Sequence, residues 1–388
     1  MFSARLYRLV ALAAVVPSLV GCATSGKRFF TADEMRSELE TRVSTQMRDE
    51  IVIPFEIDDE IRQLARDVTR DATTDSQKVR AIVRAIIGLS GFSISYDWLS
   101  NKTAREVFRE GKGNCLAYSN LFVGMARSVG IDAAYADVRF VEHVTREAEV
   151  VVRSTHITAA VRRATGNVII DFTTTPEREY LGFDVISDLE AIANFYNNQG
   201  FLYGYFTETE AVDFDPLEKE LEMYRLALEI LPTFSRARNN LGVALRRRGR
   251  VDEAIEQYKL AIEANPKSAE AHSNLGTAYL YQNRTDDALR EYRLAVKHAG
   301  RDGYVHHRLG VLYLRLGRYE EAIEQLQKAI SKEPELADAH FHLGECYREL
   351  GNEKKAIEHF EATLEIDPNY IAARTMLERL SRSGEPPR

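Results

Sequence analysis

Residues 111–135 read GKGNCLAYSNLFVGMARSVGIDAAY, and they include Cys115, one of only three cysteines in the chain. Glycines precede the cysteine, and Gly130 is of the residue type that favours the end of a helix. Between them, apolar residues recur at helical spacing. These residues are Leu116, Leu121, Phe122, Met125 and Ala126. The stretch therefore predicts a helix that begins at Cys115, where unpaired amides and the helix dipole favour a thiolate.

The segments around this helix predict an α+β domain. Residues 57–89 predict two amphipathic helices, one with a start signal at Thr74. Val- and Ile-rich runs with alternating apolar positions follow at 132–142, 146–163 and 167–175. Because the helices come first and the strands follow, we expect a small antiparallel sheet beside a helical layer.

A histidine and an aspartate lie in two of these predicted strands. His156 lies in RSTHITAAV and Asp171 lies in NVIIDFTTTP. The turn around residues 164–167 fits a β-hairpin, so adjacent strands can bring the two side chains together. A nucleophilic cysteine needs a base beside it and a third group that holds the base. The sequence therefore makes Cys115, His156 and Asp171 a candidate site.

The order of these three residues resembles the transglutaminase-like superfamily, a papain-like arrangement of cysteine hydrolases. The resemblance lies in GKGNCLAYSNLFVGMARSVGIDAAYADV, STHITAAV and NVIIDFTTTP. It implies that Cys115 is the nucleophile, His156 the general base and acid, and Asp171 the orienting group. Two positions depart from the family pattern. Thr158 stands where an aromatic residue is common, and Phe172 replaces the proline of Asp-Pro-Thr.

The groups that would stabilise an oxyanion in such a site are less well defined. The backbone N–H of Cys115 is one candidate, because it lies at the start of the predicted helix. A side chain of Tyr96, Trp98 or Asn114 could be another. The sequence leaves this choice open.

Simpler interpretations compete with the site. A lone cysteine at a glycine-flanked helix start is commonly a small buried residue, but three residues in fitting order favour a site. His143 is a rival base, although its polar surroundings, VEHVTRE, indicate a surface residue. We interpret Asp132 and Asp137 as turn or strand-edge residues.

The second half of the chain has an internal period of 34 residues. Each repeated glycine follows a leucine, precedes an alanine by twelve residues and precedes a large apolar residue by sixteen. The glycines are Gly242, Gly276, Gly310 and Gly344, and the large residues are Tyr258, Tyr292, Leu326 and Phe360. This pattern resembles the tetratricopeptide repeat, which implies two helices per unit. We expect the small residues to bring the helices of a pair together and the large residues to fill the space between units. Where the repeat usually has an early tryptophan, this chain has Arg238, His272, His306 and His340.

The predicted organisation combines an α+β transglutaminase-like domain with an all-α repeat solenoid. We expect a signal peptide at 1–21, a tether at 22–50, the transglutaminase-like domain at 51–212, the repeat domain at 213–381 and a disordered tail at 382–388. The repeat units are expected at 235–268, 269–302, 303–336 and 337–370, with a flanking helix on each side. Cys346 falls inside a repeat helix and is expected in its core.

The N-terminus predicts export and a lipid anchor. Arg5 and Arg8 precede a short apolar segment at 9–20, which is broken by a proline. The run Leu-Val-Gly before Cys22 resembles the lipobox of bacterial lipoproteins, which implies lipidation of that cysteine and a membrane partner. Ala23 is not the aspartate that is typical of inner-membrane retention, so we expect the outer membrane, facing the periplasm. An ordinary secretion signal is the alternative.

Composition excludes several functions. The formal net charge of −8 argues against general nucleic-acid binding, which needs a basic surface. No CxxC, HExxH, P-loop or glycine-rich dinucleotide motif occurs in the sequence, so neither a metal nor another cofactor is expected.

The first helices of the repeats should form a concave groove that binds a protein or peptide partner. The residues expected to face it are Arg236, Asn239, Arg246, Asn274, Thr277, Tyr281, His307, Arg308, Arg315 and Arg348. This concentration of arginines and amides in an acidic chain suits an acidic peptide or a terminal carboxylate. The alternative is an ordinary solvated face.

Two functions of different classes follow. The first is an envelope lipoprotein whose Cys-His-Asp site acts on amide bonds of protein or peptide, with hydrolysis favoured over cross-linking. The second is a non-catalytic lipoprotein adaptor whose repeats organise an envelope complex. The presence of all three site residues favours the enzyme.

Overall fold

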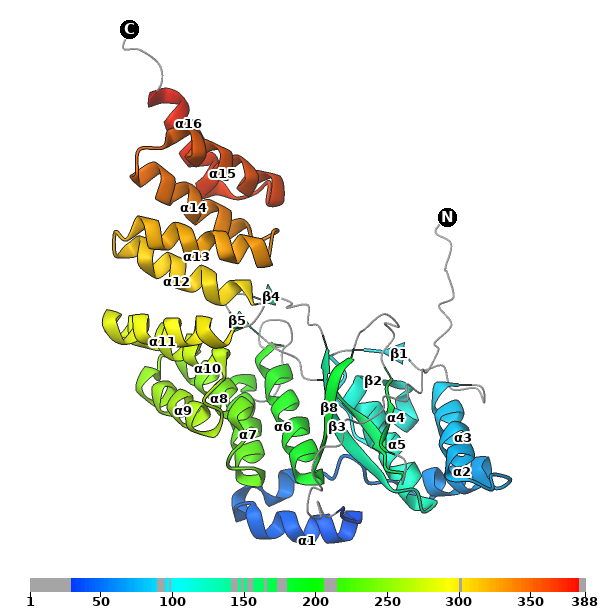
Figure 1. Cartoon of the computed structure of the whole chain (residues 1–388). Helices are drawn as coiled ribbons and strands as arrows, with labels where there is room; N and C mark the ends of the chain where they lie inside the picture. The colour runs from blue at the N-terminus through cyan, green and yellow to red at the C-terminus, as the bar shows by residue number, and fades with distance from the viewer. Residues whose placement is uncertain are drawn as a thin grey trace, which may run out of the picture. The chain divides into compact units, whose positions relative to one another are not determined.

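The computed structural model describes residues 29–88, 95–97, 99–140, 146–147, 150–151, 156–163, 166–172, 180–205, 215–299 and 302–383. The predicted signal segment, Cys22 and most of the predicted tail lie outside these residues. Contacts divide the chain into two units, residues 1–143 with 153–240 and residues 144–152 with 241–388. The first unit contains an α+β core and the second contains helical repeats, which confirms the predicted fold class (Figure 1).

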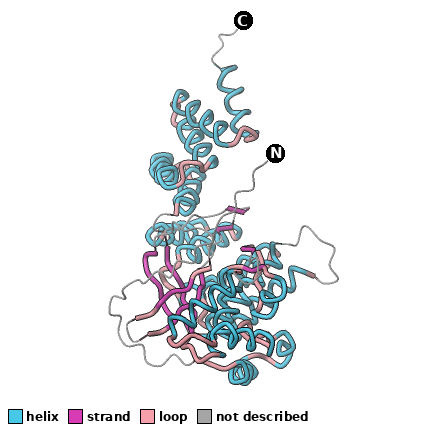
Figure 2. Tube along the Cα trace, turned by 90° about the vertical axis from the view of Figure 1, so that its right-hand side faces the viewer, coloured by secondary structure: helices cyan, strands magenta, loops and turns pink. Residues whose placement is uncertain are grey.

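Helices and a small sheet build the core of the first unit. The helices are α2 (Asp59–Thr69), α3 (Asp75–Ile87), α4 (Ala104–Glu110) and α5 (Cys115–Ser128). The four-stranded sheet has the order β7 (Val168–Ile170), β6 (His156–Val161), β3 (Ala133–Phe140) and β8 (Tyr180–Ile186). Every pairing in this sheet is antiparallel. Figure 2 shows its strands as one group beside the helices of the same unit.

Local sequence signals set the ends of these helices. Thr74 and Thr103 begin α3 and α4 with capping boxes, in which the threonine side chain and a side chain three residues later bond reciprocally. Gly88 and Gly111 end the same helices with φ values of 98° and 66°, in the left-handed region that glycine adopts without strain. Gly111 thereby ends α4 four residues before α5 begins.

The two faces of the sheet follow the alternation of its strands. Ile157, Ala159 and Val161 of β6 join the core that includes the buried face of α5. Ala160 lies on the opposite face, in a cluster with Ala136, Val138 and Ile169. α5 lies against β6 and β3 (Figure 1).

Residues 31–50 differ from the tether that we expected. They form α1 (Ala32–Arg42) and a 3-10 helix, η1 (Thr45–Glu50). Met35, Leu39 and Val43 follow one another at four-residue spacing and are buried in the core of the first unit. Three apolar residues on one face suffice to dock a helix whose other positions are charged.

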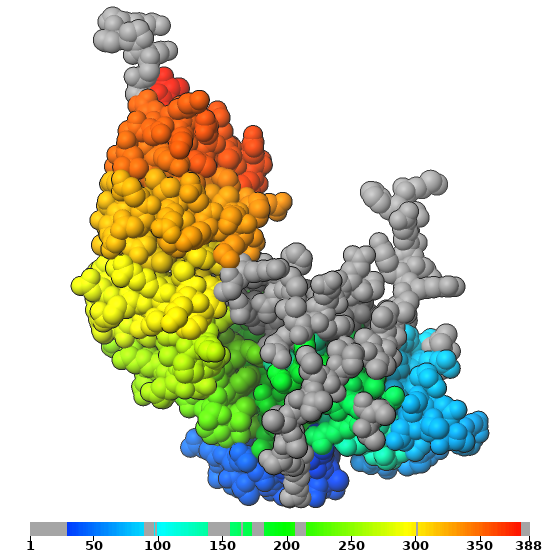
Figure 3. All heavy atoms as spheres, viewed as in Figure 1, coloured from blue at the N-terminus to red at the C-terminus, as the bar shows by residue number. Residues whose placement is uncertain are grey.

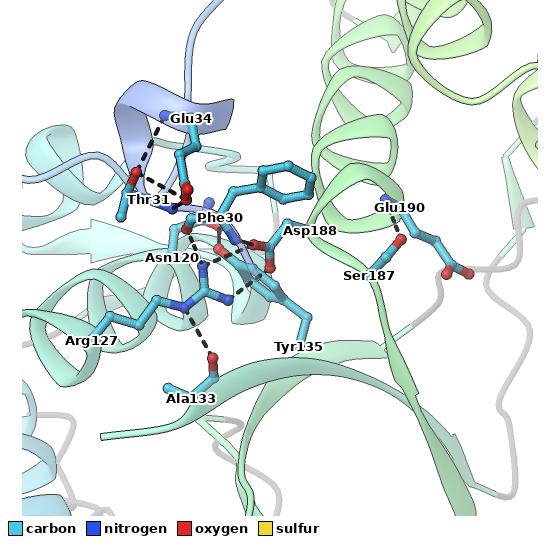
Figure 4. Close-up of polar contacts among 10 residues, drawn as sticks. All are labelled: Phe30, Thr31, Glu34, Asn120, Arg127, Ala133, Tyr135, Ser187, Asp188 and Glu190. Carbon is cyan, nitrogen blue, oxygen red and sulfur yellow. Dashed lines mark hydrogen bonds and ion pairs between the residues drawn. The ribbon is translucent and has the colours of Figure 1, made fainter. Parts of the chain in front are cut away.

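An ion pair fixes the start of this segment. Arg127 in the last turn of α5 bonds both carboxylate oxygens of Asp188, at 2.7 and 2.9 Å (Figure 4). The N–H of Phe30 donates to the same carboxylate at 2.9 Å, and Arg127 donates to the Phe30 carbonyl at 3.1 Å. Asp188 is fully buried. The pair therefore holds the N-terminal backbone through both polar groups of Phe30.

The second unit is a run of antiparallel helix pairs. After α8 (Ser235–Arg247), which crosses the boundary between the units, its helices are α9 (Val251–Ala264), α10 (Ala269–Tyr281), α11 (Thr285–His298), α12 (Gly303–Arg315), α13 (Tyr319–Lys332), α14 (Ala337–Glu349), α15 (Glu353–Ile366) and α16 (Ile371–Ser383). Drawn as spheres, the atoms of these helices form a continuous surface on the face that is shown (Figure 3). Two short strands, β4 (Arg146–Glu147) and β5 (Val150–Val151), belong to the same unit.

The repeated glycines have a direct packing reason. A Cβ atom at Gly242 would come within 2.6 Å of the Tyr258 ring, and one at Gly344 would come within 2.7 Å of the Phe360 ring. Each large residue thus packs on the glycine of its own helix pair, whereas we expected it to fill the space between units.

Most of the residues that replace the usual tryptophan tie down the turns between repeats. Arg238, His272 and His340 each donate a hydrogen bond to the carbonyl of the proline six residues before them, as does Arg374 after the last repeat, whereas His306 follows Gly300 and bonds Gln325 instead. The pairs are Arg238 with Pro232 at 2.8 Å, His272 with Pro266 at 3.2 Å, His340 with Pro334 at 3.3 Å and Arg374 with Pro368 at 2.5 Å. A polar side chain at this position therefore satisfies a backbone carbonyl of the turn.

The first unit ends in a helix pair of the same kind. α6 (Asp188–Tyr205) packs against α7 (Pro216–Ile230), and a Cβ at Gly200 would come within 2.7 Å of the Tyr224 ring. The two residues are 24 positions apart, whereas the repeats use sixteen. The longer connection explains why the sequence period did not reveal α6 as the partner of the predicted flanking helix.

Candidate active site

Cys115 is the first residue of α5, as the sequence predicts. The Asn114 side chain caps the helix by accepting a hydrogen bond from the Ala117 N–H at 2.9 Å. Gly113 allows this tight entry, because a Cβ there would lie 2.9 Å from the Cβ of Ala117. The Cys115 side chain is partly exposed and its thiol is free. The partly exposed sulfur therefore belongs to the first turn of α5, where backbone N–H groups have no intrahelical acceptor.

His156 and Asp171 come from neighbouring strands. His156 is the first residue of β6, and Asp171 follows the last residue of β7. Ala159 pairs with Ile170, so a one-residue extension sets Asp171 opposite Thr158, two positions from His156 on the same face. His156 Nε2 lies 2.7 Å from Asp171 Oδ1, and both side chains are buried.

The pKa of His156 reports the charges around it. Burial alone lowers this pKa, but the charge of Cys115 and hydrogen bonds to Asp171 and Cys115 outweigh burial and raise it to about 10. The site therefore stabilises a positively charged imidazole at neutral pH. Because Asp171 engages Nε2, the other ring nitrogen, Nδ1, is left for the thiol. The structure thus brings the three predicted residues together.

The oxyanion candidates have different positions. Asn114 uses its side-chain oxygen for the helix cap. Tyr96 pairs through its backbone with Gly113 in a short parallel ladder between β1 (Ser95–Tyr96) and β2 (Lys112–Gly113). Trp98 and the Tyr96 side chain lie outside the described residues. The N–H of Cys115 lies in the first turn of the helix, where backbone N–H groups have no intrahelical acceptor. It therefore stays a candidate donor to an oxyanion.

A set of buried amides holds the loop beside Cys115, and the sequence analysis missed it. The Asn101 side chain donates to the Phe195 carbonyl at 2.9 Å, and the backbone carbonyl of Asn101 accepts from the Gln199 side chain at 3.1 Å. The Asn120 side chain donates to the Lys102 carbonyl at 3.2 Å. Amide side chains on otherwise apolar helix faces were the available signal, because buried amides need such partners.

The rival residues lie elsewhere or have other partners. His143 is outside the described residues. Asp132 is exposed, and Asp137 lies 3.9 Å from Arg236. Cys346 is fully buried, and burial raises the pKa of its thiol to about 12. Among the described residues, no three His, Cys, Asp or Glu side chains form a group suited to a metal ion.

The predicted groove residues fall in both units. Arg236 and Asn239 belong to the first unit, where Arg236 donates to Asn194 at 2.8 Å. In the second unit, Arg308 reaches Ser273 at 3.1 Å, together with Asn274 and Thr277.

The other groove residues of the second unit form pairs or face solvent. Arg246 lies over the exposed ring of Tyr281. His307 bonds His342 at 3.1 Å. Arg315 is exposed, and Arg348 pairs with Glu349.

Comparison with known families agrees with both parts of the chain. Residues 62–172 match the transglutaminase-like superfamily. Residues 243–283, 273–325 and 307–371 match tetratricopeptide repeats. The chain carries a transglutaminase-like domain followed by tetratricopeptide repeats. The match to tetratricopeptide repeats supports protein or peptide binding by the repeat region. No curated protein sequence matches the chain.

Solved structures resemble the chain over about half of its length. YrrB, a TPR protein with an unusual peptide-binding site, is 22% identical over 48% of this chain and 92% of its own, with a TM-score of 0.38. PilF of Pseudomonas aeruginosa is 18% identical over 50% and 85%, with a TM-score of 0.45. MamA of Desulfovibrio magneticus RS-1 is 22% identical over 46% and 96%, with a TM-score of 0.38. These are likenesses of fold alone.

No helix among the residues that the structure describes is both long enough and apolar enough to cross a membrane.

Proposed function

We propose that the transglutaminase-like domain acts on amide bonds of proteins or peptides through Cys115, His156 and Asp171, and that hydrolysis is its main outcome. One observation carries this proposal: His156 Nε2 lies 2.7 Å from the buried Oδ1 of Asp171, and the charge of Cys115 acts on the same ring and raises the pKa of His156. A thiol, a base and a group that orients the base are the parts that nucleophilic catalysis requires.

The geometry suits a two-step acyl transfer. The Cys115 thiolate attacks the carbonyl carbon, and the oxyanion that forms lies near the N-terminal amides of α5. The C–N bond then breaks, the proton on His156 Nδ1 passes to the leaving amine, and a thioester remains on Cys115. Neutral His156 next takes a proton from water, the resulting hydroxide attacks the thioester, and the C–S bond breaks to regenerate the thiolate. An amine in place of water gives cross-linking.

The first test is the alkylation of Cys115 by iodoacetamide in a full chain that carries Cys22→Ser and Cys346→Ala, so that one thiol remains. Alanine suits position 346 because Ala244 and Ala278 occupy the same place in other repeats. We expect rapid labelling at neutral pH and a loss on the order of 10²-fold in His156→Ala. Slow labelling at a rate that does not change in His156→Ala would instead indicate a non-catalytic scaffold.

Substrate turnover separates the two outcomes of the thioester. We expect release of fluorescent peptides from labelled casein by the wild-type chain and none by Cys115→Ser. Incorporation of a dansyl amine in place of peptide release would make transfer the main reaction.

The repeats supply the partner site in this proposal. Arg246 and Arg315 lie on first helices of repeats and are charged groups on an acidic chain. We expect charge reversal at both positions to weaken recovery of an acidic peptide, by an amount that shrinks as salt is raised. Charge reversal of Arg290, on a second helix, is the control. If it weakened recovery of the peptide equally, a groove-specific role would be contradicted.

We also propose that the chain is a lipoprotein of the bacterial envelope, anchored at Cys22 and facing the periplasm from the outer membrane. The support is the sequence before Cys22, with its apolar segment and small residues. Incorporation of tritiated palmitate and recovery with outer-membrane vesicles should both be lost in Cys22→Ser. Retention of either one would count against the anchor.

A further inference from the structure

Asp171 lies just beyond the paired part of β7. The ladder between β6 and β7 has its last pair at Ala159 and Ile170, and Asp171 is one residue beyond it. A carboxylate that orients a catalytic base must keep its place within a fraction of an ångström. Contacts outside the ladder, among them its bond to His156, therefore help to fix this residue.

Thr158 meets that need from the neighbouring strand. Its hydroxyl donates a hydrogen bond of 2.5 Å to the carbonyl of Ile170, and the residue is 0% exposed. That carbonyl belongs to the peptide whose nitrogen is the backbone N–H of Asp171. Because the peptide is planar, fixing its oxygen also fixes the direction in which Asp171 leaves the strand.

The residue after Asp171 is held from the other side. Phe172 is buried, and its ring centroid lies 5.9 Å from that of Tyr118 and 6.2 Å from that of Phe122. Both partners belong to α5, the helix that begins at Cys115. Tyr118 also donates to the Gly111 carbonyl at 3.4 Å, just before the cysteine. Phe172 thus connects the end of β7 to α5. Thr158 fixes the peptide group between Ile170 and Asp171.

We propose that Thr158 is a positioning residue whose hydroxyl holds Asp171 against His156. This inference rests on the proposed function for its catalytic meaning. The alternative is that Thr158 only fills a buried position in a strand, for which its β-branched shape is well suited. The two roles differ in what the hydroxyl does, because valine has the same shape without the hydrogen bond.

The test compares variants in the full chain with Cys22→Ser and Cys346→Ala. Thr158→Val removes the hydroxyl and keeps the shape, whereas Thr158→Ser keeps the hydroxyl. Thr69→Val is the matched control, since Thr69 is also buried and donates to a carbonyl, that of Ala65 at 2.7 Å, within α2. The readouts are the alkylation rate of Cys115 and the NMR titration of the His156 ring, assigned with His156→Ala.

We expect Thr158→Val to slow alkylation about tenfold, the effect of weakening one buried hydrogen bond. The same variant should move the titration of His156 toward lower pH, and Thr158→Ser should restore both readouts. Thr69→Val should change neither. Wild-type values in a folded Thr158→Val, or equal losses in Thr158→Val and Thr69→Val, would overturn the positioning role. If the valine variant does not fold, Thr158→Ser and Thr158→Ala make the same comparison.

The outcome does not depend on the success of the proposed function. If the wild-type chain is alkylated no faster than His156→Ala, the proposed function fails. The NMR titration still reports the contact between His156 and Asp171, so a shift in Thr158→Val alone would keep the positioning role and its absence would end it.

Discussion

His156 Nε2 lies 2.7 Å from Asp171 Oδ1, and neither side chain is more than 7% exposed. The carboxylate engages Nε2 and leaves Nδ1 as the ring nitrogen available to the thiol, and in the proposed reaction it would stabilise the imidazolium. We therefore expect Asp171→Asn to lower kcat/KM for amide hydrolysis on the order of 10²–10⁴-fold. The measurement is the release of labelled peptides, and circular dichroism should show an unchanged fold. A loss smaller than about tenfold would argue against an orienting role.

The raised pKa of His156 gives a specific pH dependence. The leaving amine must take a proton from the imidazolium, so amide cleavage should fall as pH rises through about 10, where His156 loses that proton. Asp171→Asn removes one cause of the raised pKa, so the fall should begin at lower pH. A profile measured in both variants that has the same alkaline limb would show that another group controls it.

The same shift has a consequence for stability. The pKa of His156 is raised from 6.5 in the unfolded chain to about 10 in the folded one. Its contribution to the free energy of unfolding is therefore fully present below about pH 6.5 and is lost as pH rises toward about 10. Urea titrations across this pH range should show that the free energy of unfolding of the first unit declines as pH rises. The decline should be shallower in His156→Ala. An equal slope in both chains would contradict a coupled imidazolium.

The site was predictable because its signals are local. Cys115 begins a helix after a glycine-rich segment, His156 begins β6 and Asp171 directly follows β7, so pattern and spacing sufficed to group the three residues. The supports were not predictable. Thr158 read as a departure from a family pattern, and its bond to the Ile170 carbonyl depends on a register that only the fold supplies.

The fold shows the same division. A 34-residue period marks the repeats because the glycine and the large residue of each pair keep a constant spacing. Gly200 and Tyr224 make the same contact across a longer connection, which hides α6 from the period. In residues 31–50, three buried apolar side chains stand among many charges, so composition suggested a tether where packing makes α1.

The pair of Arg127 and Asp188 predicts how firmly the N-terminal segment is held. Breaking a buried ion pair leaves an uncompensated charge, so Asp188→Ala should lower the free energy of unfolding by about 3–5 kcal/mol. It should also expose residues 31–50 to limited proteolysis, because Phe30 loses its acceptor. The control is Asp59→Ala, which breaks an exposed pair with Arg62 and should cost less than about 1 kcal/mol. Similar costs for the two variants would show that Asp188 is not a structural anchor.

The last repeat should be sensitive to mild acid. His340 and His359 have ring centroids 5.7 Å apart and stand where the preceding repeats place His272 with Glu291 and His306 with Gln325. Burial lowers the pKa of both His340 and His359, and the charge of His340 lowers that of His359 further. Because protonation favours the unfolded chain, their contribution is present above the ordinary pKa of 6.5 and is lost as pH falls below it.

A reciprocal exchange between two repeats tests this pair. His359→Gln copies the third repeat, in which Gln325 bonds His306 at 2.9 Å, and should reduce the loss of stability between about pH 7.5 and about pH 5.5. Gln325→His copies the last repeat and should increase that loss. Urea midpoints of the repeat transition measure both. If the two exchanges move the acid sensitivity in the same direction, the histidine pair is not its source, because a general loss of packing would act alike in either repeat.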